Sequence, residues 1–443
     1  MLSYFDYTPS KEWINNSKEI IQIIQAKKLK TYLTGLWNSS TFYKDLWKRA
    51  GIYEPPTSQQ SFQKLPMVYP FHLIGRTAYN ILSTDSSKIR YKFCSGGTTG
   101  NPKLLYYTDV DWEKRAIYRS KLEQLRGVGK NDRVQIMVPY GIWNVGYSAQ
   151  SAFELTGATV IPTGSWMIGM DTCLALMKQL KTTILMATPS LALKMANRLK
   201  CSRVDLSDLN LRFLITTGEA VPSGMRRELE EKWNTTLSAT YASSEVVVGV
   251  ECNQHDGYHF LADDLVIEAV DEDGNLCGEG ETGEIVVTPL INEALPLIRY
   301  RLGDLVKISW EKCPCGLEYP RVWFKGRIKN TFALATGVKV YPWQIQDFME
   351  KLSFRVQRFQ IIIEDTKEDD DFLDVVLETP DTSENARKEA ENAFGRLSID
   401  LEDGMIQKNI QFKITLVDPG TFPGTQISQK QAVFIIDKRR YQR

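Results

Sequence analysis

The chain has 443 residues, of which 43% are hydrophobic and 24% charged, and its 54 basic residues balance its 54 acidic ones. This is the composition of an ordinary globular protein, and the length predicts about two or three domains. The charge balance gives no whole-chain electrostatic argument for nucleic acid or an anionic membrane as a partner. No apolar run reaches the roughly 18 residues of a membrane helix, and the N-terminus lacks a signal-peptide pattern, so we expect a soluble, cytoplasmic protein.

In chain order, residues 11–52 are predicted to be helical, and a further helix is predicted from Asp109 to about Val128, capped by Thr108 or Asp109. Strand and helix patterns then alternate. The strands are expected at 134–138, 158–161, 183–187, 211–216 and 237–241, and the helices at 146–155, 172–180 and 223–233. This alternation predicts an α/β fold with a mostly parallel sheet flanked by helices.

The C-terminal part has a different pattern. Strands are expected at 354–363, 372–377 and 410–417, and a charged helix at 383–394, which together predict a small α+β unit of ~110 residues. The acidic run Glu364–Asp371 is predicted to be a solvated loop. We place the boundary near Gly326–Asn330, which gives an N-terminal domain at 1–328 and a C-terminal domain at 329–443.

The strongest functional signal is the segment from Cys94 to Lys103. Its residues 95–100 contain three glycines and three hydroxyl side chains, and a lysine follows. Glycine lets the backbone approach a ligand, successive N–H groups bind anions, and lysine adds a positive charge. The segment is not a Walker A loop, because Asn-Pro-Lys follows the last glycine. It predicts a phosphate-binding loop of another type, the alternative being an ordinary surface turn.

Four later segments are expected where strands end, which is where open α/β sheets bind ligands. They are Gly218-Glu219-Ala220, Tyr241 to Glu245, Arg299 to Asp304, and Gly326 to Asn330. Each alone is also typical of a turn or a helix cap.

The order of these segments resembles the adenylate-forming superfamily of acyl-CoA synthetases, adenylation domains and luciferases. Within it the chain is most similar to the phenylacetate–CoA ligase branch, on the basis of Tyr140-Gly141, Thr188-Pro189-Ser190, Glu293 to Pro296 and Cys313-Pro314-Cys315-Gly316. The resemblance runs from Phe42 to Arg439. It implies a large N-terminal domain and a small, mobile C-terminal domain that swings about a hinge at Lys329.

The resemblance also implies roles for individual residues. Glu245 would hold Mg²⁺, Tyr241 would stack near adenine, Asp304 would accept the ribose hydroxyls, and Arg327 would reach the ribose or the phosphates. The full set implied to bind ATP is Ser95, Gly96, Gly97, Thr98, Thr99, Gly100, Lys103, Gly218, Glu219, Ala220, Tyr241, Ser244, Asp304 and Arg327. Glu245, Arg327 and Lys430 are the candidate catalytic residues.

The reaction implied is an ATP-dependent acid–thiol ligation. A carboxylate attacks the α-phosphate and expels pyrophosphate, and the thiol of CoA then displaces AMP. Two alternatives stay open. The acyl group could pass to a carrier-protein phosphopantetheine or an amine, or the chain could be an inactive homologue that binds nucleotide or a partner domain. Histidine is scarce, with only His72, His255 and His259, which weighs against a histidine-driven hydrolase. The branch also implies a homodimer.

One departure from the family concerns the C-terminal lysine that stabilises charge during adenylation. Gln431 stands at that position, and Lys430 stands where the family has glycine. Losing a charge donor of the transition state costs about 10²–10³-fold in rate. Either Lys430 reaches the site after a one-residue shift, or adenylation is slow and the protein mainly carries out the second step.

Cysteine and histidine gather in two short segments. Cys and His are the ligands of structural zinc, so Cys252, His259, Cys313 and Cys315 are predicted to bind Zn²⁺, with His255 as a substitute. The alternative is that the two cysteines are small turn residues and His259 is an exposed polar residue. Seven cysteines in all do not indicate a disulfide scaffold.

The acyl pocket is implied to lie around Tyr140, Gly141, Trp143, Trp166 and Ala242. Apolar and aromatic linings are typical of small-ligand pockets, so a small aromatic acid is expected. The two tryptophans could equally be core residues.

Overall fold

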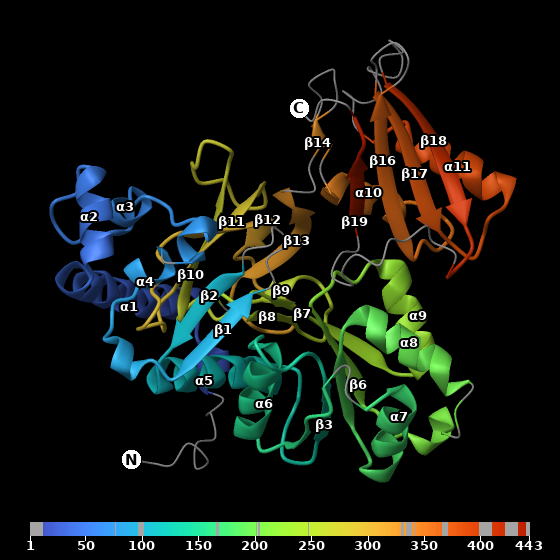
Figure 1. The fold of residues 1–443 in the computed structure, drawn as a ribbon, viewed down its shortest axis with the longest axis horizontal. Helices are drawn as coiled ribbons and strands as arrows, with labels where there is room; N and C mark the ends of the chain where they lie inside the picture. The colour runs from blue at the N-terminus through green and yellow to red at the C-terminus, as the bar shows by residue number, and fades with distance from the viewer. Residues whose placement is uncertain are drawn as a thin grey trace.

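The structure is a computed structural model that describes residues 12–75, 77–95, 102–164, 168–200, 202, 204–246, 248–328, 332–333, 339–340, 342–365, 371–397, 410–420 and 433–439. In Figure 1 the chain forms a large N-terminal body, coloured blue to yellow, and a smaller C-terminal unit in orange and red. None of the helices in these ranges combines the length and hydropathy of a membrane span.

The N-terminal helices cap one end of the large body. Ser17 begins α1 (Lys18–Ser39) by accepting a hydrogen bond from the N–H of Ile20, and Ser40 begins α2 (Thr41–Arg49) in the same way. Tyr43 and Trp47 of α2 are fully buried against the main core. The 3₁₀ turn Glu12–Asn15 precedes α1, and after α2 come the short helices α3 (Gln59–Gln63) and α4 (Thr77–Asn80) and the 3₁₀ turns Pro70–Leu73 and Ser86–Lys88.

A two-stranded antiparallel hairpin comes next, made of β1 (Tyr91–Ser95) and β2 (Lys103–Tyr107). It leads directly into α5 (Asp109–Leu125), which starts with a capping box between Thr108 and Asp111. The cap at Thr108 is one of the two that the sequence predicts.

The large sheet has eleven strands among the described residues, in the order β10-β11-β12-β13-β9-β8-β7-β6-β5-β3-β4. From β7 to β4 the pairs are parallel and alternate in sequence with helices. These elements are β3 (Arg133–Met137), α6 (Val145–Leu155), β4 (Thr159–Ile161), α7 (Met170–Gln179), β5 (Ile184–Ala187), α8 (Pro189–Leu199), the 3₁₀ turn Leu206–Asp208, β6 (Phe213–Thr217), α9 (Ser223–Trp233) and β7 (Thr236–Ala242). This confirms the α/β fold.

The other half of the same sheet is antiparallel, which makes the sheet mixed rather than mostly parallel. The strands are β8 (Val248–Glu251), β9 (Tyr258–His259), β10 (Leu265–Val270), β11 (Thr282–Pro289), β12 (Tyr300–Ser309) and β13 (Arg321–Arg327). Figure 1 shows this half in yellow and pale orange, on the side from which the chain continues to the C-terminal unit.

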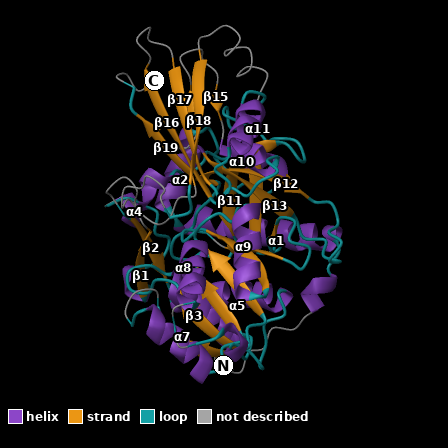
Figure 2. Cartoon of the chain, turned by 90° about the vertical axis from the view of Figure 1, so that its right-hand side faces the viewer, coloured by secondary structure: helices purple, strands orange, loops and turns teal. Residues whose placement is uncertain are grey.

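The C-terminal unit is a four-stranded sheet, β18-β17-β16-β19, covered by helices. Side chains of α10 and α11, among them Phe348 and Phe394, join the strands in one buried cluster. Figure 2 shows the strands of this unit rising above the large body. Its elements are β14 (Phe332–Ala333), β15 (Lys339–Val340), α10 (Pro342–Glu350), β16 (Arg358–Asp365), β17 (Asp371–Glu378), α11 (Glu384–Phe394), β18 (Ile410–Val417) and β19 (Val433–Asp437).

The α+β character of this unit agrees with the sequence. The boundary at 328/329 stays a prediction, because residues 329–331 lie outside the described residues.

Candidate active site

Four loops that carry candidate residues follow parallel strands. They come after β3, β5, β6 and β7. Because parallel strands point the same way, these loops meet at one edge of the sheet, where open α/β sheets bind ligands.

The hairpin β1–β2 presents the two described ends of the predicted phosphate loop. Ser95 ends β1 and lies directly opposite Lys103, the first residue of β2. The Ser95 hydroxyl is buried and has no hydrogen-bond partner in the described ranges. Gly96, Gly97, Thr98, Thr99 and Gly100 lie outside the described residues. The hairpin therefore places a serine and a lysine at directly opposite positions, one at each described end of the loop.

Lys103 forms an ion pair with Glu245, which is only 5% exposed. The Ser243 hydroxyl donates to the other carboxylate oxygen, Oε2, at 2.6 Å. Burial raises the pKa of Glu245, but the charge and hydrogen bond of Lys103 together with Ser243 outweigh it, so the pKa lies below its ordinary value. Glu245 is thus an ionised, buried carboxylate beside Lys103, at one end of the predicted phosphate loop.

The turn that carries Glu245 is fixed by three neighbours. The Tyr107 hydroxyl and the Asn144 side-chain amide donate to the carbonyl oxygen of Ser244, at 2.9 and 3.1 Å. Arg115 of α5 donates to the carbonyl oxygen of Val246. These contacts hold the carboxylate in place before any ligand binds. Sequence reasoning missed Tyr107, Asn144 and Arg115, because only the fold brings them to this turn, whereas Ser243 belongs to the segment from Tyr241 to Glu245 that the sequence indicated.

A second charged pair joins β12 and β13. Asp304 and Arg327 are register partners, and Nε of Arg327 lies 3.1 Å from Oδ1 of Asp304. The Tyr241 hydroxyl donates to Oδ2 at 2.6 Å. Burial raises the pKa of Asp304; Arg327 and Tyr241 oppose that rise, and the charge of Glu245 adds to it. The Tyr241 hydroxyl links this pair to the end of β7, and Glu245 lies in the turn that follows β7, so the two pairs belong to one site.

Glu219 has a local partner of its own. It follows Gly218, which has φ +84°, and its carboxylate accepts from the N–H and the hydroxyl of Ser190 at 3.1 and 2.6 Å. Burial raises its pKa, against the hydrogen bonds of Ser190. Ser190 opens α8, so this pair ties the loops after β5 and β6 together.

The predicted acyl-pocket residues are partly brought together. Tyr140 packs edge-on against Tyr147 with ring centres 5.0 Å apart, and the Ile142 carbonyl accepts from the Cys94 N–H at 2.9 Å. This hydrogen bond places the 139–144 loop beside the β1–β2 hairpin. Trp143 is 40% exposed, so it is not a core residue. Gly141 adopts φ +88°, Ala242 ends β7, and Trp166 lies outside the described residues.

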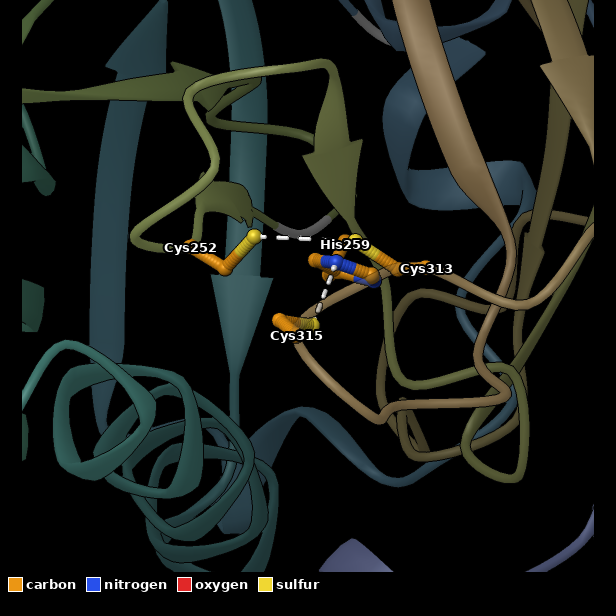
Figure 3. Close-up of side chains that lie close together, drawn as sticks. All are labelled: Cys252, His259, Cys313 and Cys315. Carbon is orange, nitrogen blue, oxygen red and sulfur yellow. Dashed lines mark hydrogen bonds between the residues drawn. The ribbon is translucent and has the colours of Figure 1, made fainter.

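The predicted metal ligands form one cluster, shown in Figure 3. The ligand atoms of Cys252, His259, Cys313 and Cys315 all lie within 4.8 Å of one another. His255 is not part of it: its Nδ1 lies 3.5 Å from the Glu251 carboxylate. The reading of His259 as an exposed polar residue is wrong, because the side chain is fully buried.

Three further predicted residues, Lys329, Lys430 and Gln431, lie outside the described residues, so their roles stay predictions.

The C-terminal unit docks on α9. Gln357 donates to Glu228 at 2.8 Å and Arg355 pairs with Glu231 at 3.2 Å. Gly224, near the start of α9, meets the same segment of the C-terminal unit: a Cβ there would stand 2.7 Å from the carbonyl oxygen of Val356. This contact has no room for a side chain.

We therefore expect Gly224→Ala to loosen the docking of the C-terminal unit by about 1–3 kcal/mol, the usual cost of overpacking. Faster cleavage between the units by a protease and a larger radius of gyration in solution scattering would report it. Gly35→Ala in α1, where a Cβ meets nothing within 4 Å, is the matched control. Equal behaviour of the two variants would contradict the docking role.

Comparison with known proteins agrees with this geometry. The model of the family "AMP-binding enzyme" matches residues 47–289, more than half of the chain, and that of the "AMP-binding enzyme C-terminal domain" matches residues 337–439. Phenylacetate-coenzyme A ligase of Thermus thermophilus is 25% identical over 452 residues, which cover 98% of this chain and 100% of that protein. Indoleacetate–lysine synthetase of Pseudomonas savastanoi is 23% identical, over 78% of this chain and 83% of that protein.

Among solved structures, 2-hydroxyisobutyryl-CoA ligase in the postadenylation state, in complex with R3-HIB-AMP, has a TM-score of 0.79 at 21% identity. The match covers 97% of this chain and 94% of the ligase chain. The same ligase in the thioesterification state has a TM-score of 0.69. The resemblance inferred from the sequence motifs is thereby confirmed, and this chain belongs to the AMP-binding enzyme family.

Proposed function

We propose that the protein activates a small aromatic carboxylic acid with ATP and transfers the acyl group to the thiol of CoA. The observation that carries the proposal is the convergence of two charged pairs, Lys103–Glu245 and Asp304–Arg327, at the ligand-binding edge of the sheet. The family match and the relatives named as CoA ligases support it. An inactive scaffold has no physical need for a buried carboxylate such as Glu245 held ionised beside a phosphate loop.

In the first step an oxygen of the acid bonds to the α-phosphorus of ATP, and the bond from that phosphorus to the bridging oxygen breaks, so pyrophosphate leaves. Ser95 and Lys103 would bind the β- and γ-phosphates, and Asp304 would accept the ribose hydroxyls. Mg²⁺, when bound, supplies charge neutralisation for the phosphates, and Glu245 is the carboxylate suited to hold it. Lys103 already pairs with Glu245, so ATP binding is expected to draw this ammonium towards the phosphates.

In the second step the sulfur of CoA bonds to the acyl carbon, AMP leaves with the electron pair of the broken C–O bond, and the thiol proton passes to solvent. Lys329 would be the hinge about which the C-terminal unit reorients between the steps. ATP and CoA are cytoplasmic metabolites, so we expect the enzyme in that compartment. A homodimer stays a prediction that light scattering would test. Zinc takes no part in these two steps.

The alternative keeps the fold and changes the acceptor to a carrier-protein phosphopantetheine or an amine. The similarity to indoleacetate–lysine synthetase, whose name indicates an amine acceptor, favours it, as does Gln431 in place of the family lysine.

Product masses distinguish these acceptors. The enzyme would be incubated with ATP, Mg²⁺ and a panel of aryl and alkyl acids, with CoA, a phosphopantetheinyl carrier protein or a set of amines. An acyl-CoA from an aromatic acid supports the proposal. Pyrophosphate release with acyl transfer only to a carrier or an amine supports the alternative, and product only from alkyl acids would contradict the assigned substrate class.

The one-residue shift of Lys430 is tested separately. If Lys430 supplies the missing charge, Lys430→Ala should slow pyrophosphate release and leave transfer from a preformed acyl-adenylate unchanged. Gln431→Ala is the neighbouring control. An unchanged rate of pyrophosphate release in Lys430→Ala would exclude the shifted lysine.

A further inference from the structure

The Cys252, His259, Cys313 and Cys315 cluster is built from three separate segments. Cys252 follows β8, His259 ends β9, and the two other cysteines lie in the turn between β12 and β13. The side chains of Cys252, His259 and Cys313 are buried, at 3%, 0% and 1% exposure, and Cys315 is partly buried. Figure 3 shows the four side chains pointing into one small volume. No disulfide joins the cysteines in the described part of the chain.

The distances fit a tetrahedral zinc ion. With Zn–S bonds of about 2.3 Å and a Zn–N bond of about 2.05 Å, an ideal tetrahedron has edges of about 3.8 Å between two sulfurs and about 3.5 Å between sulfur and nitrogen. Here the Sγ atoms of Cys252 and Cys313 are 3.8 Å apart, and Sγ of Cys315 lies 3.5 Å from Nε2 of His259. These two distances match the tetrahedron, and the remaining pairs of ligand atoms lie within 4.8 Å of one another.

Hydrogen bonds within the protein do not explain why the polar ring of His259 is buried. The His259 ring is fully buried, Nδ1 has no hydrogen-bond partner in the described ranges, and Nε2 lies 3.5 Å from the thiol of Cys315, which is a weak partner. The N–H of Gln254 points at Sγ of Cys252 at 3.5 Å, a contact that stabilises a thiolate. Burying a histidine among three thiols is unfavourable without a cation to bind them.

The structure assigns to Cys252, His259, Cys313 and Cys315 a structural Zn²⁺ site of Cys₃His type. All four positions are filled by protein, so no coordination site is left for water or substrate, as in structural rather than catalytic zinc sites. The site belongs to the sheet and is independent of the proposed reaction.

The metal would fix a strand that the nucleotide site needs. Asp256, in the loop between Cys252 and His259, accepts from Arg321 at 2.6 Å and from the Trp323 ring N–H at 2.8 Å, so this loop is bound to β13. A Cβ on Gly257 would stand 2.9 Å from the Trp323 ring, which shows how closely loop and strand pack. The same strand ends at Arg327, the partner of Asp304.

The cluster is also linked to α9, the helix on which the C-terminal unit docks. Glu251, next to Cys252, binds Arg226 of α9 through both carboxylate oxygens at 2.7 and 2.8 Å. A zinc ion here would therefore stabilise the segments that contact β13 and α9.

Metal analysis tests the site directly. Full-length protein without a histidine tag, purified from medium that contains zinc, should hold about one zinc per chain, as a closed site of four protein ligands requires. A thiol reagent that modifies the cysteines should release this zinc, and Co²⁺ in its place should give the absorption of tetrahedral thiolate coordination.

Variants separate the site from adventitious metal. Cys315→Ser and Cys313→Ser should lose zinc and melt several degrees lower. Cys277 is a partly buried cysteine outside the cluster, so Cys277→Ser should keep the zinc content and the melting temperature of the wild type. Because a ligand variant could fail to fold, chelator-treated wild-type protein is measured alongside; its melting temperature should fall and recover when zinc is returned. Absence of stoichiometric zinc in the wild type, or zinc that persists in soluble Cys315→Ser protein, would overturn the assignment.

Discussion

Replacing Glu245 with glutamine is expected to slow pyrophosphate release by about 10²–10³-fold, the usual effect of removing one group that stabilises the transition state. Glutamine keeps the shape of the side chain and its contact with Ser243 but removes the negative charge that pairs with Lys103 and that would hold Mg²⁺ in the proposed reaction. A pyrophosphate-release assay should show a lower kcat and an altered dependence of the rate on Mg²⁺ concentration.

The control for this variant is Glu384→Gln, which breaks an exposed ion pair with Arg387 far along the chain. It should behave like the wild type, because exposed ion pairs contribute little. Circular dichroism and the melting temperature would establish that Glu245→Gln is folded. A folded variant that releases pyrophosphate at the wild-type rate would remove Glu245 from the reaction.

Replacing Asp304 with asparagine should mainly weaken ATP binding. The carboxylate is 4% exposed and is bound by Tyr241 and Arg327, which fix the position from which it would accept the ribose hydroxyls in the proposed function. Hydrogen bonds to a charged acceptor contribute about 1.5–3 kcal/mol, which predicts a rise in KM for ATP of roughly 10- to 150-fold. The change in kcat should be smaller.

Substrate analogues make this test specific to the ribose. The wild type should lose affinity for 2′-deoxyATP, and Asp304→Asn should discriminate much less between ATP and 2′-deoxyATP. Asp374→Asn, which removes a partly buried, ion-paired carboxylate from the C-terminal sheet, is the matched control. If Asp304→Asn kept the full wild-type discrimination, the carboxylate would not be the ribose acceptor.

The sequence predicted the local features of this protein well. The alternation between residues 134 and 241 corresponds to the parallel half of the sheet, and the predicted metal ligands lie together as their residue types indicate. Helix α8 was not predicted, although Thr188 as N-cap and Pro189 as the first helical residue are a good start signal. In the tail, α10 and β19 were missed as well.

What could not be predicted depends on pairing between distant segments. The strands from β8 to β13 are antiparallel and joined by irregular loops, so no alternation with helices marks them. Lys103 pairs with Glu245 only when the β1–β2 hairpin packs beside the end of β7. The same packing allows Tyr107 and Asn144 to donate hydrogen bonds to the Ser244 carbonyl oxygen. The motif residues were therefore predictable from the sequence, whereas the side chains that position them were not.

The central claim is that this chain cleaves ATP between the α- and β-phosphates to make an acyl-adenylate. A single-turnover reaction with ATP, Mg²⁺ and an aromatic acid that the panel identifies, without any acceptor, tests it most directly. We predict equal amounts of pyrophosphate and enzyme-bound acyl-AMP, with no ADP. Formation of ADP and phosphate, or pyrophosphate without acyl-AMP, would contradict the account.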